Sequence, residues 1–415
     1  MHPDAYSGAG NLALVAMRSG PFPIAALICG LAVSLAVPAA ASAAPDQERI
    51  GPGEIRDKVA GAWLGAVIGG AWGRPTEFHH RGHIVPAGEV PAWSVDYANR
   101  YAFRGESDET YVEIPFLDAT LREGPGAGWP QWGAALASSD FPLFFANRRA
   151  RENLRAGIPP PLSGDPAHNP YADDIDFQIE SDWIGLAAPR QPGAAIDIAW
   201  RLGHVTNYGD GVYGGVMIAA MHAAAFQAAS IGEIVEAGRE AVPEGSRYRA
   251  MIEDVLRWHS RHPRDWTAAW RRLERRWNAH SPQVKHTAPD SEFNVDAKLN
   301  GGYVLLGLLY GQGDFTRTIR IAIRAGQDSD CNPSNAASIL GTWLGRKRIP
   351  ARLRHGIAFD RRFPHTGYTL GDAIAGNLAL AAQLTAARGG SAGVGGWSLA
   401  PSPLLPPPLE QWPAA

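Results

Sequence analysis

The chain has 415 residues, of which 45% are hydrophobic, and a formal net charge of -3. This composition can supply a large core, and the near-neutral charge gives no electrostatic reason to expect nucleic acid or an anionic membrane as a partner. The 47 glycines are scattered through apolar segments, which indicates closely packed helices rather than flexible linkers.

Residues 1–43 predict a secretory signal peptide. Arg18 precedes a short apolar segment, and Ala-Ser-Ala at 41–43 provides the small residues of a cleavage site. A retained membrane anchor is the alternative, but Pro38 and the Ala-rich exit favour cleavage. We therefore expect a secreted or periplasmic protein with no stable membrane association. Cleavage leaves a single cysteine, Cys331, so no intrachain disulfide is expected.

The body of the chain, residues 44–388, predicts one all-α domain. Small and apolar residues make 57–73 a buried helix, whose glycines imply the close approach of another backbone. Residues 109–123 predict a second helix with a kink at Pro115. A period near 3.6 continues through 194–205, 213–229, 230–242, 248–262, 264–280, 300–311 and 316–326.

Three segments predict irregular structure. Residues 79–104 and 157–174 are rich in Pro, Gly, Asp and His, which is typical of loops. The tail, residues 389–415, has the composition of a linker, and we expect it to be disordered or loosely packed.

Two carboxylates and a thiol stand at the start of a predicted helix. Asp328, Asp330 and Cys331 precede a run of small residues, for which Asn332 is a suitable N-cap and Pro333 a suitable first residue. Residues two apart do not share a helix face, so the two carboxylates can converge on one ion only from an irregular turn.

A second acidic turn resembles the first. Ser107, Asp108 and Glu109 stand at the start of the helix predicted at 109–123. Each turn alone is consistent with ordinary acidic residues at a helix N-terminus. Together they offer four carboxylates, which would repel one another without a cation and which suit a hard divalent ion such as Mg²⁺. Spacing alone does not show that the two turns meet.

Four segments in order resemble the ADP-ribosylglycohydrolase family. They are GAWLGAVIGGAWGRPTEF at 61–78, SDET at 107–110, GHVTNYGDGVYGG at 203–215 and GQDSDCNPSNAASILG at 326–341. The resemblance implies a single-domain orthogonal helical bundle with two Mg²⁺ ions in a central cleft. The implied metal ligands are Ser107, Asp108, Glu109, Asp328, Asp330 and Cys331. The implied catalytic residues are Glu77, Asp108 and Glu109, and the implied substrate-binding residues are Gly70, Asn207, Tyr208, Gly209 and Tyr213.

The chain departs from the family pattern at several of these positions. The usual Gly-Asp of the first segment is Gly-Gly here, so that a cleft carboxylate is missing at Gly70. Glu109 replaces Asp and is one methylene longer, and Asn207 stands where the family usually has His. Cys331 replaces Thr, and a thiol is a poor ligand for a hard ion. Either water takes that position or the site prefers Mn²⁺ or Zn²⁺.

The segment 168–186 is the most acidic part of the chain. A helix here would bury Ile175, Ile179 and Trp183 on one stripe, and we interpret its carboxylates as a solvated face. The alternative is a loop that feeds the cleft, with Asp174 as a substrate-binding residue.

These features favour a secreted metal-dependent glycohydrolase that cleaves the ribosyl C1 bond of ADP-ribosylated or related nucleoside-like substrates. Two alternatives stay open: a catalytically impaired protein that binds ADP-ribose, and a metal-dependent phosphoesterase. The expected partner is the substrate, and we expect a monomer.

Overall fold

The glycine-rich helix α1 (Pro52–Gly73) packs directly against α16 (Cys331–Leu344), whose first half is rich in small residues. A Cβ atom at Gly61, Gly65 or Gly69 would lie only 2.2–2.3 Å from a carbonyl oxygen of α16. Side chains at these positions would therefore force the helices apart, and glycine is needed despite its low helix propensity. This contact is the close backbone approach that the glycines of α1 predict.

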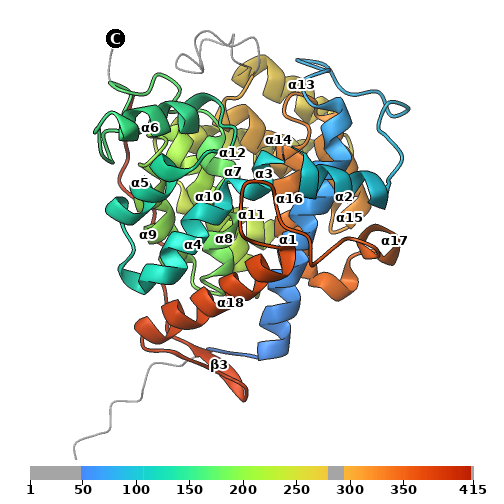
Figure 1. The fold of residues 1–415 in the computed structure, drawn as a ribbon. Coiled ribbons are helices and arrows are strands. Elements are labelled where there is room, and N and C mark those ends of the chain that lie inside the picture. Colours follow the sequence, from blue (N-terminus) through green and yellow to red (C-terminus); the bar gives the residue numbers. More distant parts are fainter. Residues whose placement is uncertain (1–47, 106, 279–293, 413–415) are drawn as a thin grey trace, which may run out of the picture. The chain divides into compact units, whose positions relative to one another are not determined.

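The computed structural model describes residues 48–412, apart from 106 and 279–293 (Figure 1). The predicted signal peptide lies outside the described residues. The described part is mostly helical, which confirms the all-α class. None of its helices combines the length and the apolar character needed to cross a membrane.

The predicted periodic segments between 194 and 326 agree broadly with helices α9 (Pro192–Gly203), α10 (Asp210–Ala225), α11 (Ile231–Ala241), α12 (Arg247–Arg261), α13 (Trp266–Trp277), α14 (Ala297–Gly311) and α15 (Phe315–Arg324). The structure adds further helices that the periodicity did not predict: α5 (Trp129–Ser138), α6 (Phe145–Arg155), α17 (Ala351–Arg354) and α18 (Leu370–Ala387). Short 3₁₀ turns are η1 (Arg74–Thr76), η2 (Gly124–Gly126) and η3 (Arg346–Arg348).

The predicted kink near Pro115 is a full interruption of the helix. α3 (Asp108–Tyr111) ends at Tyr111, and α4 (Glu113–Glu123) begins two residues later, with Val112 between them. Proline has no amide hydrogen to donate to the carbonyl four residues earlier, which explains why the helical hydrogen bonds fail here. The acidic turn at 107–109 is thereby separated from the longer helix that follows.

Part of the predicted loop 79–104 is helical. α2 (Val95–Arg104) starts at Ser94, whose side chain accepts a hydrogen bond from the amide of Tyr97 at 3.2 Å. Its buried face includes Ala98 and Tyr101. The prediction of an irregular segment is therefore wrong for 95–104, because a short amphipathic pattern with a good N-cap was hidden among turn-forming residues.

The acidic segment is buried rather than solvated. It forms two short helices, α7 (Asp176–Ile179) and α8 (Asp182–Leu186), instead of one. Its five carboxylates are between 0% and 5% exposed: Asp173, Asp174, Asp176, Glu180 and Asp182. The backbone amides of Ala146 and Asn147 donate to Asp174 and Asp176, at 2.9 and 2.7 Å. The interpretation as a solvated face is wrong, because such hydrogen bonds offset part of the cost of burial.

The tail is anchored, contrary to the prediction of disorder. β1 (Glu48–Ile50), β3 (Gly396–Leu399) and β2 (Ser391–Gly393) form an antiparallel sheet in the order β1-β3-β2. Further along, the hydroxyl of Ser402 accepts from the amide of Ala194 at 2.8 Å. A Pro-rich segment has few amide donors of its own, but it is fixed here by side chains and by donors on other elements.

Candidate metal centre

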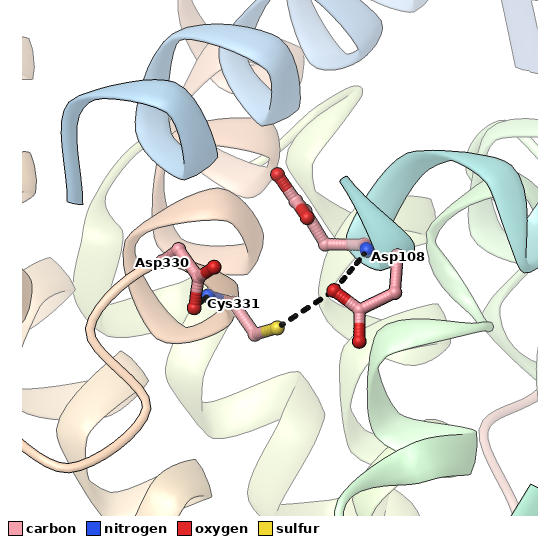
Figure 2. Close-up of side chains that lie close together, drawn as sticks. Asp108, Asp330 and Cys331 are labelled. Carbon is pink, nitrogen blue, oxygen red and sulfur yellow. Dashed lines mark hydrogen bonds between the residues drawn. The ribbon is translucent and has the colours of Figure 1, made fainter. Parts of the chain in front are cut away.

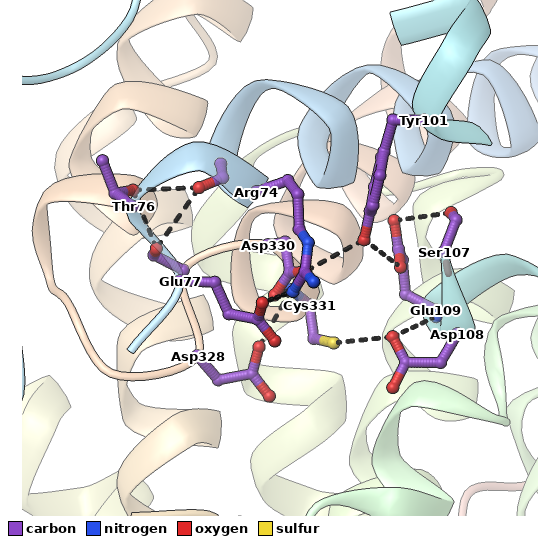
Figure 3. Close-up of polar contacts among 12 residues, drawn as sticks. Arg74, Thr76, Glu77, Tyr101, Ser107, Asp108, Glu109, Asp328, Asp330 and Cys331 are labelled. Atoms are coloured by element: carbon purple, nitrogen blue, oxygen red, sulfur yellow. Dashed lines mark hydrogen bonds and ion pairs between the residues drawn. The ribbon is translucent and has the colours of Figure 1, made fainter. Parts of the chain in front are cut away.

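The structure brings the two acidic turns together in one buried cluster (Figures 2 and 3). One ligand atom from each of four residues lies within 4.8 Å of the others: Asp108, Glu109, Asp330 and Cys331. Glu77, Asp328 and Asp330 form a second such group. Asp330 is common to both, so the acidic side chains form two adjacent candidate sites that share one carboxylate.

The 326–331 turn has the irregular shape that convergence requires. Gly326 and Gln327 have positive φ angles of 82° and 54°. The amide of Phe78 donates to the carbonyl of Gln327 at 2.8 Å, and the amide of Gln327 donates to the carbonyl of His80 at 3.1 Å. These paired hydrogen bonds hold the end of the Gly-rich segment against the turn and bring Glu77 to the cluster.

α16 begins earlier than its sequence suggests. Asp330 is the N-cap, and its Oδ1 accepts from the amide of Cys331 at 2.9 Å. Asp328 Oδ1 accepts from the same amide at 3.2 Å. The prediction of Asn332 as N-cap is therefore wrong, because the aspartates themselves satisfy the free amide at the helix start. This capping orients both carboxylates into the cluster.

Glu109 occupies the space above Gly70. Its carboxylate accepts from the hydroxyl of Ser107 at 3.0 Å and from that of Tyr101 at 3.2 Å. A Cβ atom at Gly70 would lie 1.8 Å from Oε1 of Glu109. The missing side chain at 70 and the extra methylene at 109 are thus parts of one arrangement, in which the longer carboxylate uses the room that glycine leaves.

Burial and mutual repulsion raise the pKa values of the cluster. The pKa of Asp108 is raised to about 7, mainly by burial and then by the charge of Asp330. The same two causes raise the pKa values of Glu109 and Asp328 well above the ordinary range. Burial followed by the charge of Asp328 also raises the pKa of the Cys331 thiol. A divalent cation would relieve this repulsion, so the donor set fits a metal.

Cys331 lies at the edge of the first group. Its thiol is 3.9 Å from Oδ1 of Asp108, and a dashed line marks this contact in Figure 2. The residue is buried and is the one free cysteine of the described chain. It is placed to contact an ion held by Asp108 and Asp330, although a protonated thiol is a weak ligand for a hard cation.

Two residues of the cluster were missed from the sequence. The guanidinium of Arg74 forms an ion pair with Glu77, and one of its nitrogens lies 3.6 Å from Oδ2 of Asp330 (Figure 3). The hydroxyl of Tyr101 lies 2.9 Å from Oδ2 of Asp330 and 3.2 Å from Glu109, and its single hydrogen is shared between these two carboxylates. The spacing of Arg74 before Glu77 was a weak signal, whereas nothing local distinguished Tyr101.

The predicted substrate residues beyond Gly70 lie outside the two ligand groups. Asn207 is fully buried and donates to the carbonyl of Asp174 at 3.0 Å. The amide of Gly209 donates to the carboxylate of Glu410 at 3.1 Å, and Tyr213 donates to a tail carbonyl at 3.0 Å. Tyr208 is half-buried next to them. The tail therefore covers the loop that the resemblance assigns to substrate.

The fold and the site define an all-helical protein with an acidic centre suited to divalent cations. A family model described as ADP-ribosylglycohydrolase matches residues 52–390, and the chain belongs to this family. Among solved structures, one titled "ADP-ribosylglycohydrolase-related protein complex" is 18% identical with a TM-score of 0.51, and the match covers 79% of this chain and 98% of that one. This likeness shows the fold. No curated protein matched the sequence. The family is metal-dependent and indicates hydrolase activity on ADP-ribosyl-type substrates.

Proposed function

We propose that this protein is a secreted, metal-dependent glycohydrolase that cleaves the glycosidic bond at the ribosyl C1 of ADP-ribosylated or related nucleoside-like substrates. The observation that carries the proposal is the sharing of Asp330 by two groups of acidic ligands from three distant parts of the chain. A charge cluster of this kind is costly unless it serves a cation or a reaction.

The residues support a pair of Mg²⁺ ions, with Mn²⁺ as the alternative. Asp108, Glu109 and Asp330 would hold one ion, and Glu77, Asp328 and Asp330 the other. Oxygen-rich sets of this kind suit Mg²⁺, whereas the thiol of Cys331 favours a softer ion at the first position. When bound, the ions would supply Lewis-acid stabilisation and would orient the ribose hydroxyls.

The chain's own groups can carry the proton transfers. In the hydrolysis the bond from C1 of the ribose to the leaving nitrogen or oxygen breaks, and a water oxygen bonds to C1. Asp108 or Glu109 accepts the proton of that water, and the leaving group takes up a proton. Glu77 stands at the other side of the cluster, where its ion pair with Arg74 holds the carboxylate beside Asp330.

Export rests on the predicted signal peptide at 1–43. A secreted enzyme would act on an extracellular ADP-ribosylated partner or on a free nucleotide sugar. We propose that it does so as a monomer, with no stable membrane association.

The test is a release assay on ADP-ribosyl-arginine and ADP-ribosyl-serine, with and without Mg²⁺. We expect free ADP-ribose from at least one substrate, and loss of release in Asp330→Asn. Asp197→Asn is the matched control, because Asp197 is an exposed aspartate in an i,i+4 ion pair on α9. Release of AMP would identify a phosphoesterase instead. Binding of ADP-ribose without turnover, measured by calorimetry, would identify a catalytically impaired binding protein.

A further inference from the structure

The outer face of α15 carries an unusual concentration of arginine. Arg317, Arg320 and Arg324 are three and then four residues apart, so they share one helix face. Arg352 joins them from α17. The four side chains line a hollow of about 480 Å³, called here the arginine groove, which Trp266, Asp314, Thr316 and Ile321 complete. Guanidinium groups from separate elements thus surround one concave site.

Within the described part of the chain, none of these four guanidinium groups has a carboxylate within ion-pair distance. Several surface arginines are instead paired on their own helices, such as Arg122 with Asp118 at 2.8 Å and Arg201 with Asp197 at 3.1 Å. The nearest acid in the groove, Asp314, is used as the N-cap of α15 and accepts from the amide of Arg317 at 2.7 Å. The groove therefore has an excess of positive charge on a protein whose formal net charge is -3.

Two of the four side chains are held in place by uncharged partners. Nε of Arg324 donates to the carbonyl of Val85 at 3.0 Å, and its guanidinium lies 5.3 Å from the ring centre of Trp266. Arg352 donates to the hydroxyl of Thr316 at 2.8 Å. These contacts fix the guanidinium groups on different walls without neutralising them. A site that is positioned before it binds loses less entropy on binding.

We propose that the arginine groove binds a compact phosphate-bearing anion of the diphosphate type. Guanidinium groups match phosphate oxygens in geometry and bind them through paired, charge-assisted hydrogen bonds. The volume is in the range of small-molecule sites. The ring of Trp266 is already covered by Arg324, so the phosphate groups rather than a stacked base provide the recognition. No residue of the acidic cluster lines this groove, and the inference is independent of the proposed hydrolase activity.

The test is calorimetric titration of the full mature chain with inorganic pyrophosphate in the presence of EDTA, which removes divalent metal. We expect saturable binding by the unaltered protein, and binding weakened about tenfold or more in Arg320→Gln and in Arg317→Gln. Neither guanidinium group has a hydrogen-bond or ion-pair partner among the described residues, so we expect both variants to keep the fold, which circular dichroism checks.

Two matched variants locate the site. Arg122→Gln removes an exposed arginine on α4 and should bind pyrophosphate as the unaltered protein does. Asp108→Asn alters the acidic cluster and should also leave binding unchanged. The proposal fails if the unaltered protein does not bind pyrophosphate, or if both groove variants bind it normally. Tight, strongly salt-dependent binding of a 20-mer duplex, without pyrophosphate binding, would also overturn it, because the ligand would then be nucleic acid.

Discussion

Gly70→Ala is the sharpest test of how the acidic cluster is held. The added Cβ would lie 1.8 Å from Oε1 of Glu109, whereas ordinary contacts begin near 3.4 Å, so the carboxylate must move by about 1.6 Å. Its hydrogen bonds from Ser107 and Tyr101, at 3.0 and 3.2 Å, cannot survive such a displacement.

The lost hydrogen bonds outweigh the gain in helix propensity, so the substitution should destabilise the protein. Two lost hydrogen bonds to a buried carboxylate cost about 3 kcal/mol, and the gain in helix propensity from Gly to Ala offsets about 1 kcal/mol. We therefore expect the free energy of unfolding, measured by urea denaturation in EDTA, to fall by about 2 kcal/mol. Gly53→Ala, in the same helix with open space around it, should raise it by up to about 1 kcal/mol.

A double-mutant cycle with Glu109→Asp isolates the contact. Aspartate at 109 does not reach the space above Gly70, so in that background Gly70→Ala should no longer destabilise the protein. The expected coupling free energy between the two substitutions is about 3 kcal/mol, far above the few tenths of a kcal/mol expected for independent sites. Additive effects in this cycle, or a Gly70→Ala protein as stable as the original, would refute the reasoning.

Three further predictions concern the other buried groups. Asp108→Asn should raise the free energy of unfolding by about 1–3 kcal/mol in EDTA at pH 8, because the substitution relieves repulsion with Asp330. In Mn²⁺ the same variant should be less stable than the unaltered protein. Denaturation with and without metal measures both effects, and a loss of stability in EDTA would contradict the repulsion. Cys331→Thr should leave Mg²⁺ affinity equal or improved in calorimetry, since the hydroxyl is a harder ligand; a collapse of binding would show that the thiolate is a true ligand of a softer ion. Burial raises the pKa of Asp176 from 3.8 to about 6, so its contribution to stability is present below pH 4 and is lost as the pH rises through 6. Asp176→Asn removes this component, so its stability relative to the unaltered protein should rise by about 3 kcal/mol from pH 4 to pH 7 in EDTA, and a constant difference across that range would exclude the assigned pKa.

Local patterns in the sequence predicted the features that depend on local structure. The glycines of α1 indicated a close helix contact, and the acids at 107–109 and 328–331 stood where helices begin. Both signals follow from helix propensity and from the free amides at a helix N-terminus. Their meeting in space was implied by a family resemblance and not by spacing.

The features that depend on tertiary packing could not be predicted from one sequence. The fit of Glu109 over Gly70 joins two elements whose relative position no local pattern specifies. The acidic segment around Asp176 was expected to be solvated, because the backbone amides that satisfy its carboxylates come from another helix. The tail has a linker's composition, yet Glu410 accepts hydrogen bonds from donors about 200 residues earlier in the chain.

Counting bound Mn²⁺ ions by calorimetry or electron paramagnetic resonance tests the central claim most directly. If Asp330 is shared between two sites, the unaltered protein binds two ions, Asp108→Ala binds one, and Asp330→Ala binds none with comparable affinity. Two ions still bound by Asp330→Ala would contradict a shared carboxylate, and no metal binding by the unaltered protein would remove the basis of the proposed chemistry.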